Sequence, residues 1–454
     1  MALLKPALQE IDKIREKDII GVCEQTEETL IVPYRDWEKK EKPAVVYKIP
    51  IEYCKYRVDN GRIITQVLTH KKKKGELNPD DVSTQELLAS FLADSDRAQN
   101  ENLKKKIKIE GQKEAAIITA DGFLINGNRR KMVLEQLNKE NPNKDYQYLK
   151  VVRLPGTDNS ALRPTIADIA LLENRYQVYT TGKSEYTLMN KIMTLYKNEK
   201  NGIPLSQMLA DDPTYAALDE KKLVSAIKKF RRENFEPLEL MMQYLEENNL
   251  KDDYVKVADK WSSFQEYSKI INPKLKDAVF REDNSMREQD IGLIQSAAFN
   301  VIKLKEHDVV GSRTNEIIRK FPEWIGIDKN ELYKIGRIED TKKDIQDPDE
   351  KYNVWNDDNK EEILNSLKKL KGLSDKKKDQ EGPIKKLEEI MKKLEDEKLA
   401  LKSLTFMPTT DLPDALKIAN KIQTRINYVV QLLYYVNKGD EYKIESLLEK
   451  FNKE

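Results

Sequence analysis

The order of apolar and polar positions divides the chain into a mixed α/β part followed by a longer helical part. Before residue 76, short apolar runs such as IIGV and AVVYKIPI predict one helix near the start and then a few strands. The lysine-rich run HKKKKG, residues 70–75, is interpreted as a solvated loop, with a phosphate-facing patch as the alternative.

Between residues 84 and 154 the pattern alternates between helices and strands. TQELLASFL and NENLKKKIKIEG predict two helices, the second ending at Gly111, and AAIIT, FLI and YLKVVRL predict three strands. Asp121-Gly122 is a hairpin signal between the first two strands, and a helix with an apolar stripe begins at Arg129. We expect these helices to pack on a small mixed sheet.

Strand signals largely end after residue 160, and helices separated by short polar breaks are predicted to about residue 335. The polar stretch 341–360 predicts a linker before a C-terminal helical region. In that region a heptad seam, interrupted by Lys398, comprises Ile384, Leu387, Met391, Leu394 and Leu401. The seam favours a helix hairpin within the chain, with the apolar helix DALKIANKIQTRINYVVQLLYYV packed on it, over a homodimer through the helical regions.

The expected fold class is therefore α+β, a small mixed α/β domain followed by predominantly helical domains. The expected divisions of the 454 residues are 1–83 as a mixed segment leading into the α/β domain, 84–160 as that domain, 161–250 as a helical region, 251–340 as a helical domain, 341–360 as the linker and 361–454 as a hairpin or bundle.

Composition excludes several classes of protein. Lys and Arg number 80 against 79 Asp and Glu, so any electrostatic function must come from a local patch. No apolar run is long enough for a membrane helix, and the start lacks a secretory pattern. Cys23 and Cys54 exclude a disulfide framework and suit a reducing cytoplasm, where we expect the protein. With only His70 and His307 besides, a Cys/His zinc site is excluded, whereas a carboxylate-held Mg²⁺ stays open.

The stretch DGFLINGNRRKMVLEQL, residues 121–137, places two arginines where a strand gives way to a helix. Gly127 lets a ligand approach the backbone, and the first helical turn offers unpaired N–H groups and the positive end of its dipole. Arg129 and Arg130 add charged planar forks that match phosphate oxygens. The other interpretation is an ordinary turn whose arginines pair with acids on a neighbouring element.

The order of elements resembles the ParB/sulfiredoxin superfamily, and best the N-terminal domain of ParB proteins. GQKEAAII (111–118), GNRR (127–130) and LLENRYQ (171–177) stand where that family has G-Q-x-x-P-I, G-E-R-R and E-N-x-Q-R. The resemblance covers roughly residues 84–180 and continues into a helix-turn-helix region to about 250. Residues 260–454 resemble no family that we can name.

The resemblance implies a site for a nucleoside triphosphate, CTP or ATP, with Mg²⁺. It implies a phosphate cradle formed by Gly127, Asn128, Arg129 and Arg130, a pocket edge at Gly111 and Gln112, and Mg²⁺ ligands at Glu173 and Asn174. Carboxylate and amide oxygens suit this hard cation. Apart from the resemblance, Glu173 and Asn174 would be a polar patch on an amphipathic helix.

The chain departs from the family pattern at several positions. Asn128 replaces the Glu of the box, Ala115 replaces the proline, and Arg175 and Gln177 exchange the order of Gln and Arg. Phosphate binding is still expected. Which base the nucleotide carries, and whether an NTPase activity hydrolyses it, are both left open. Sulfiredoxin chemistry is excluded, because it needs a cysteine where Asn128 stands.

The resemblance implies a ParB-like nucleotide-dependent DNA-binding protein, in which the bound NTP controls how the helical domains engage DNA or a partner. Two alternatives to this function follow from the same residues. A phosphotransferase or nuclease of this fold would use the cradle to position a phosphoryl group, with Glu114 and Asp121 as the nearest candidate bases. A nucleotide-free binding module of a plasmid, phage or mobile element would keep the fold without the ligand.

The segment IPLSQMLADDPTYAALDEKKLVSAIKKFRREN predicts helix, turn and helix at the place where ParB proteins have their helix-turn-helix. The second helix carries the candidate DNA-binding residues Lys221, Lys222, Lys228, Lys229, Arg231 and Arg232. Its predicted buried stripe consists of Leu223, Val224, Ile227 and Phe230. DNA is therefore an expected partner, with a merely solvated basic face as the alternative.

Overall fold

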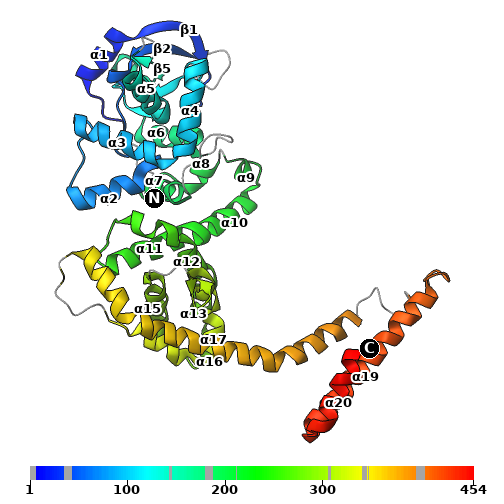
Figure 1. The fold of residues 1–454 in the computed structure, drawn as a ribbon. Helices are drawn as coiled ribbons and strands as arrows, with labels where there is room; N and C mark the ends of the chain where they lie inside the picture. Colours follow the sequence, from blue (N-terminus) through cyan, green and yellow to red (C-terminus); the bar gives the residue numbers. More distant parts are fainter. Residues whose placement is uncertain are drawn as a thin grey trace. The chain divides into compact units, whose positions relative to one another are not determined.

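A five-stranded sheet lies at the centre of the α/β part of the protein in the computed structural model (Figure 1). The structure describes residues 7–34, 43–142, 146–178, 188–210, 212–304, 308–339, 345, 347–394 and 404–453. The strands are β1 (Glu24–Leu30), β2 (Ala44–Pro50), β3 (Ala116–Ile118), β4 (Leu124–Asn126) and β5 (Tyr148–Arg153), in the order β1-β2-β5-β3-β4. Neighbouring strands are antiparallel except for the parallel pair β3 and β5. The mixed sheet and the α+β class are confirmed.

Six helices accompany the sheet. They are α1 (Lys13–Val22), α2 (Ile64–Lys74), α3 (Val82–Ser95), α4 (Arg97–Glu110), α5 (Asn128–Glu140) and α6 (Ile166–Glu173). Short turns of helix are η2 (Ile51–Tyr53), η3 (Gly61–Ile63), η5 (Thr157–Asn159) and the π-helical η6 (Asn174–Val178). Because β1, β2 and α2 belong to the same folded part as β3 to β5, residues 1–83 do not form a separate segment.

Alternation along the strands gives the sheet two apolar faces. Ala116 and Ile118 join a core with side chains of α3, α4 and α5, whereas Ile117 between them joins a second core with side chains of α6. The predicted hairpin between β3 and β4 is confirmed, and Gly122 adopts a φ of 92° in its turn. The sheet thereby fixes the junction from β4 to α5 between two helical layers.

The lysine run of residues 70–75 is helical rather than a loop, so that prediction is wrong. Ile64 and Val67 are buried on α2 and anchor its early turns in the core. Lys71 to Lys74 form the last turn, where the helix dipole favours positive charge, and Gly75 ends the helix.

The following helices share one hydrophobic core. They are α7 (Leu188–Lys200), α8 (Leu205–Leu209), α9 (Pro213–Ala216), α10 (Glu220–Phe230), α11 (Glu236–Glu247), α12 (Trp261–Glu266), α13 (Asn272–Lys276), α14 (Ala278–Asp283), α15 (Asp290–Lys303), α16 (Thr314–Gly336) and the first half of α17 (Pro348–Leu394). The π-helical turns η7 (Arg231–Phe235) and η9 (Tyr267–Ile271), the 3-10 helix η8 (Tyr254–Lys260) and the two-residue strands β6 (Asp308–Val309) and β7 (Ser312–Arg313) complete this region. The predicted division between residues 250 and 251 therefore falls inside a single core.

The predicted linker at 341–360 is helical from Pro348 onward, which corrects that interpretation. Trp355 is fully buried, and its indole N–H donates to the carbonyl oxygen of Glu339 at 3.1 Å. Residues 341–344 and 346 lie outside the described residues. The chain divides further along, into the units Met1–Lys371 and Gly372–Glu454.

The C-terminal unit contains the second half of α17, then α19 (Leu412–Lys438) and α20 (Glu441–Lys453). Gly439 ends α19 with a φ of 64°, and α20 packs against α19. Ile384, Met391 and Leu394 are exposed, so the described residues do not bury the predicted heptad seam. Leu401, the last residue of the seam, and Lys398, which interrupts it, lie outside the described residues.

Among the helices that the structure describes, none is both long and apolar enough to span a membrane.

Candidate functional site

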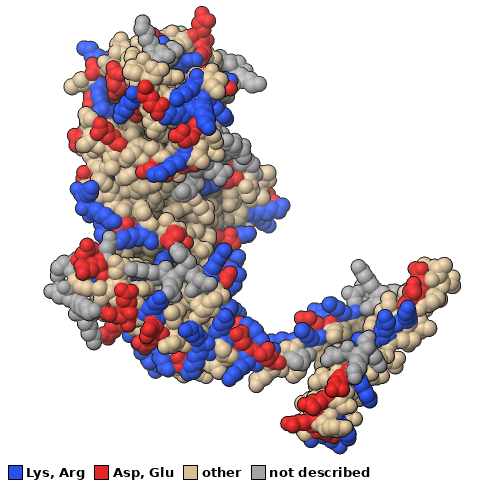
Figure 2. Space-filling view, in the orientation of Figure 1, with Lys and Arg blue, Asp and Glu red and all other residues tan. Residues whose placement is uncertain are grey.

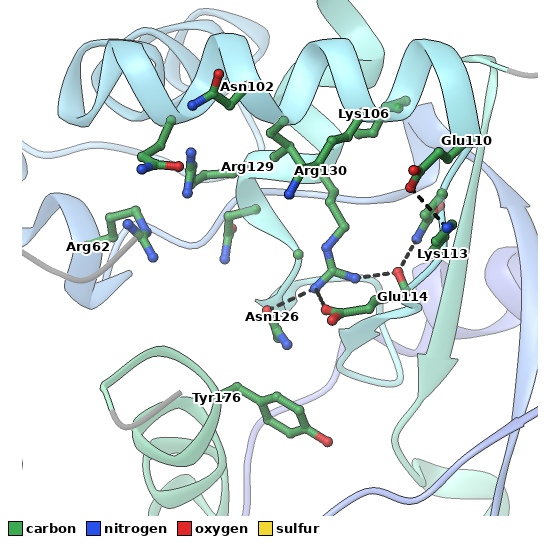
Figure 3. A pocket seen from close by; sticks show the side chains of 17 residues that line it. Arg62, Asn102, Lys106, Glu110, Lys113, Glu114, Asn126, Arg129, Arg130 and Tyr176 are labelled. Atoms are coloured by element: carbon green, nitrogen blue, oxygen red, sulfur yellow. Dashed lines mark hydrogen bonds and ion pairs between the residues drawn. The ribbon is translucent and has the colours of Figure 1, made fainter. Parts of the chain in front are cut away.

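A pocket of about 420 Å³ opens beside the junction from β4 to α5 (Figure 3). Its walls come from η3, α4, the segment between α4 and β3, the first turn of α5, and η6. The six residues predicted to hold and border a phosphate all line it: Gly111, Gln112, Gly127, Asn128, Arg129 and Arg130. The structure therefore brings the cradle and the predicted pocket edge together.

Both the backbone conformation and the close packing at position 127 require glycine. Its φ is 96°, and a Cβ there would lie 2.5 Å from the Cβ of Ala116 on β3. As the residue before α5 it carries no side chain to cap the helix, so the first N–H groups of α5 have no side-chain acceptor. The positive end of this 13-residue helix therefore opens onto the pocket.

Arg129 is held in place but keeps an unused donor. Its Nε donates to Oδ1 of Asn100 at 2.6 Å, and Asn100 is itself fixed by donating to two carbonyl oxygens of α3. Among the described residues, the buried Nη2 of Arg129 has no hydrogen-bond partner. Burial first, and the neighbouring Arg62 second, lower the pKa of Arg129 to about 10. An anion in the pocket would accept a hydrogen bond from Nη2 of Arg129 and would offset the repulsion between Arg129 and Arg62.

Arg130 is instead enclosed by its own chain. Its guanidinium donates to the carbonyl oxygens of Glu114 and Ala115, and to Oδ1 of Asn126 at 3.4 Å. The Glu114 carboxylate lies 3.6 Å away, and Figure 3 shows these contacts converging on the arginine. Burial lowers its pKa. For Arg130 the ordinary interpretation, an arginine paired with a neighbouring segment, describes the structure.

Gln112 shapes the pocket wall as a substitute for strand pairing. Its Oε1 accepts from the backbone N–H of Lys150 at 2.8 Å, and its Nε2 donates to the carbonyl oxygen of Lys150 at 2.8 Å. The same Nε2 also donates to the carbonyl oxygen of Glu114 at 2.9 Å. Because its side chain makes these contacts, Gln112 stabilises β5 at Lys150 and is not directed at a ligand.

The lining also includes residues that were not predicted from the sequence, among them one arginine, one lysine and one tyrosine. Arg62 lies on η3, Lys106 on α4 and Tyr176 on η6, and each arrives from a different element (Figure 3). Burial and Glu114 raise the pKa of Tyr176 to about 12, so it is a neutral phenol. The sequence predicted α4 as a basic helix, which contains Lys106. In contrast, the residues around Arg62 gave no indication that its side chain lies near Arg129.

The lining is positive in sum. Its cations are Arg62, Lys106, Lys113, Arg129 and Arg130, and its acids are Glu110 and Glu114. Lys113 pairs with Glu110 at 3.0 Å. Asn128 is buried, and its Oδ1 has no hydrogen-bond partner. Together these groups suit an anionic ligand that also presents a donor.

The predicted Mg²⁺ ligands Glu173 and Asn174 do not line the pocket. One carboxylate oxygen of Glu173 accepts from the N–H of Gly61 at 3.0 Å, and the other lies 3.3 Å from Nη1 of Arg57. Both side-chain atoms of the buried Asn174 lack partners. Within the described residues no group of three or more His, Cys, Asp or Glu forms a metal cluster. In this arrangement Glu173 is committed to protein contacts and does not fit the role of a metal ligand.

The turn that carries Arg62 is tied to the helical region. The side-chain amide of Asn190, buried on α7, donates to the backbone carbonyl of Arg62. Its Oδ1 accepts from the Thr65 hydroxyl at 2.8 Å. A wall of the pocket and the first helix of the large helical core thus share one buried hydrogen-bonded group.

The candidate DNA-binding residues of α10 and η7 are exposed. Charges of both signs are interspersed over the face of the molecule seen in Figure 2. Lys222 pairs with Asp219 at 3.0 Å, Arg231 with Glu199, and Arg232 lies 3.8 Å from Glu233. The six residues are Lys221, Lys222, Lys228, Lys229, Arg231 and Arg232.

The segment around α10 differs from the expected two-helix motif. The predicted stripe is only half-buried at Leu223, Ile227 and Phe230, and Val224 is 49% exposed, so no side chain of α10 is buried. The short helix α9 occupies the predicted turn, and α10 continues through η7 into α11. Helix α10 contacts α8 and η7, and through η7 it runs on into α11.

Comparison with known proteins gave no match to any family model, curated protein or solved structure. The ParB-like relationship based on GQKEAAII, GNRR and LLENRYQ stays a prediction.

Proposed function

We propose that the pocket binds a nucleoside triphosphate, CTP or ATP, and that its occupancy controls how the helical region engages DNA or a partner, as in a ParB-like protein. The observation that carries this proposal is the pairing of an open helix N-terminus with the unpaired Nη2 of Arg129. Both are features that an anionic group would satisfy, and a phosphate supplies several acceptor oxygens at once.

The phosphate end of the ligand would lie between Arg129 and Arg62. Both residues line the pocket, and after burial the charge of Arg62 lowers the pKa of Arg129. Like charges repel each other, and a phosphate between these two groups would instead make a charge-assisted contact with each. Lys106 on α4 adds a third cation to the same lining.

The rest of the pocket suits the remainder of a nucleotide. A volume of about 420 Å³ lies within the range of small-molecule sites, roughly 300–1,000 Å³. Tyr176 contributes an aromatic ring, on which a base could stack, and Asn102 and Gln99 contribute amides. These groups supply base contacts without defining which base is preferred.

Mg²⁺ would bind together with the triphosphate and would offset part of the negative charge of the phosphates. Glu173 would reach a metal only after leaving Gly61 and Arg57. Asn174 has a side-chain oxygen without a partner. We therefore expect phosphate contacts with Arg129 to persist without Mg²⁺, with the metal adding affinity for the triphosphate.

The effect of ligand binding would be transmitted to the helical region through η3. A ligand that draws Arg62 inward moves the carbonyl to which Asn190 of α7 donates. Because Asn190 is buried, its amide cannot exchange that acceptor for water at no cost. The first helix of the core that supports α10 and α11 would then respond to the ligand.

The test is Arg129→Ala in the full chain, with Lys139→Ala as the control at the exposed end of the same helix. Loss of charge-assisted hydrogen bonds of about 1.5–3 kcal/mol corresponds to a fall in nucleotide affinity of roughly 10- to 100-fold. Calorimetric titration of CTP and ATP with Mg²⁺ measures it, and circular dichroism checks that both variants remain folded. Equal affinity of the wild type and Arg129→Ala would contradict the proposal.

A thermal-shift panel of CTP, ATP, GTP and UTP with Mg²⁺ distinguishes the remaining functions. Stabilisation by at least one nucleotide supports the proposal, and stabilisation by none supports a nucleotide-free module. Free nucleoside diphosphate with intact DNA indicates a nucleotide switch. Nicked DNA or a phosphorylated small molecule indicates a nuclease or a phosphotransferase.

A further inference from the structure

Helix α19 carries an uninterrupted heptad pattern of apolar residues. The spacing alternates between three and four residues through Leu412, Ala415, Ala419, Ile422, Ile426, Val429, Leu433 and Val436. Polar side chains occupy the opposite side, at Lys417, Thr424, Gln431 and Lys438. A stripe of this period lies along one side of a helix and is the pattern by which helices pair over their full length.

This heptad stripe is not covered within the described residues. No residue of α19 is buried, and the exposed fractions of Ile422, Leu433 and Val436 are 42%, 51% and 56%. An exposed apolar surface of this extent is unfavourable in water and marks an interaction site.

Helix α20 covers a different side of α19. The ammonium group of Lys443 lies 5.3 Å from the ring centroid of Tyr435, and Leu447 of α20 is buried. Tyr435 lies outside the heptad stripe, whereas its neighbour Val436, within the stripe, is exposed. The α19–α20 hairpin therefore leaves the stripe on its outer side.

The seam of α17 is too short to cover this stripe. From Ile384 to Leu394 it extends over about 15 Å at 1.5 Å per residue, whereas the stripe from Leu412 to Val436 extends over about 36 Å. Counted to Leu401, the seam is still shorter in residues than the stripe. A hairpin within one chain would leave a large part of the stripe in water.

We propose that the stripe of α19 packs against α19 of a second copy of this chain, so that two α19–α20 hairpins form a four-helix bundle. A second copy offers a surface of the same length and period. One of the two heptad positions carries β-branched Ile422, Val429 and Val436 after Ala415, and the other carries Leu412, Ala419, Ile426 and Leu433. Leucine or isoleucine at the first position of a heptad with β-branched residues at the fourth favours assemblies of more than two helices. Leu416, Ile418 and Val430 widen the apolar side, as a bundle requires and a two-helix coil does not.

The test is the molar mass of the full-length protein by size-exclusion chromatography with light scattering at tens of micromolar. We expect twice the chain mass of 52.9 kDa for the wild type. Ile426→Glu, in the centre of the stripe, should give monomers, with at least a 100-fold weaker dimer. Thr424→Glu, on the polar side of the same helix, should leave the dimer unchanged.

Ile426 and Thr424 are both exposed in the single chain, so neither substitution should unfold it, and equal helix content by circular dichroism checks this. A monomeric wild type would overturn the proposal, as would a dimer that survives Ile426→Glu. Met391→Glu on the α17 seam should leave the dimer intact; if it produced monomers, the interface would belong to α17 instead.

Discussion

Two adjacent arginines at the start of α5 have different surroundings, and this separates support of the fold from contact with a ligand. The guanidinium of Arg130 donates hydrogen bonds to Glu114, Ala115 and Asn126, and it thereby holds α5 against the segment before β3. Arg129 is anchored through one nitrogen by Asn100 and keeps another unpaired at the pocket. Position along a helix thus decides which of two identical side chains can meet a ligand.

Gly127 allows a prediction about stability at the residue scale. Gly127→Ala adds a methyl group 2.5 Å from the Cβ of Ala116 at a φ of 96°, whereas Gly111→Ala at a φ of 68° meets open space. Backbone strain should lower the free energy of unfolding by about 1 kcal/mol in both variants. The clash should add about 1–3 kcal/mol for Gly127→Ala alone. Urea denaturation of both variants measures the difference, and equal losses would contradict a packing role for Gly127.

Helix α17 shows at the element scale why the sequence misled. Residues 341–360 are rich in Asp, Lys and Asn, and that composition is typical of a linker. Yet Trp355, Ile363, Leu367 and Leu370 recur at helical spacing and are buried in the shared core. The burial of a few apolar residues at helical spacing therefore determined the structure of this segment, despite its many charged residues.

Trp355→Ala tests this interpretation of α17. Loss of a fully buried tryptophan should lower the free energy of unfolding by about 3–5 kcal/mol. Lys376→Ala, exposed on the same helix, should change it by less than about 0.5 kcal/mol. Chemical denaturation followed by circular dichroism compares the two variants. An unchanged free energy of unfolding for Trp355→Ala would support the linker interpretation instead.

The elements around the pocket were predictable because their signals are local. Gly111 and Gly127 mark a helix end and a helix start, and Asp121-Gly122 marks a hairpin, without reference to distant residues. Arg62 could not be placed, because its contact with the pocket depends on how η3 packs beside α5. Glu173 has the carboxylate that a metal requires, but only the folded chain shows Arg57 beside it.

For the whole molecule, the basic surface of α10 predicts an electrostatic contribution to DNA binding. Lys228→Glu with Lys229→Glu should weaken binding to any duplex and reduce the slope of log affinity against log salt by about 2, since each lysine that contacts a phosphate contributes about 1. Fluorescence anisotropy with a labelled duplex over a salt series measures both quantities.

The matched control for α10 is Lys392→Glu with Lys393→Glu, which makes the same change in net charge on exposed residues of α17. This control should bind DNA as the wild type does. If both double variants lost affinity equally, the effect would come from total charge, and α10 would not be the DNA-binding surface.

The buried amide of Asn190, bonded to the carbonyl of Arg62, has a consequence that works in both directions. Suppose that a nucleotide shifts η3 and thereby strengthens DNA binding by some factor. Thermodynamic reciprocity then requires DNA to strengthen nucleotide binding by the same factor. The length and sequence of a DNA partner could therefore be found without a DNA-binding assay, by titrating the nucleotide in the presence of candidate duplexes and selecting the one that tightens its affinity.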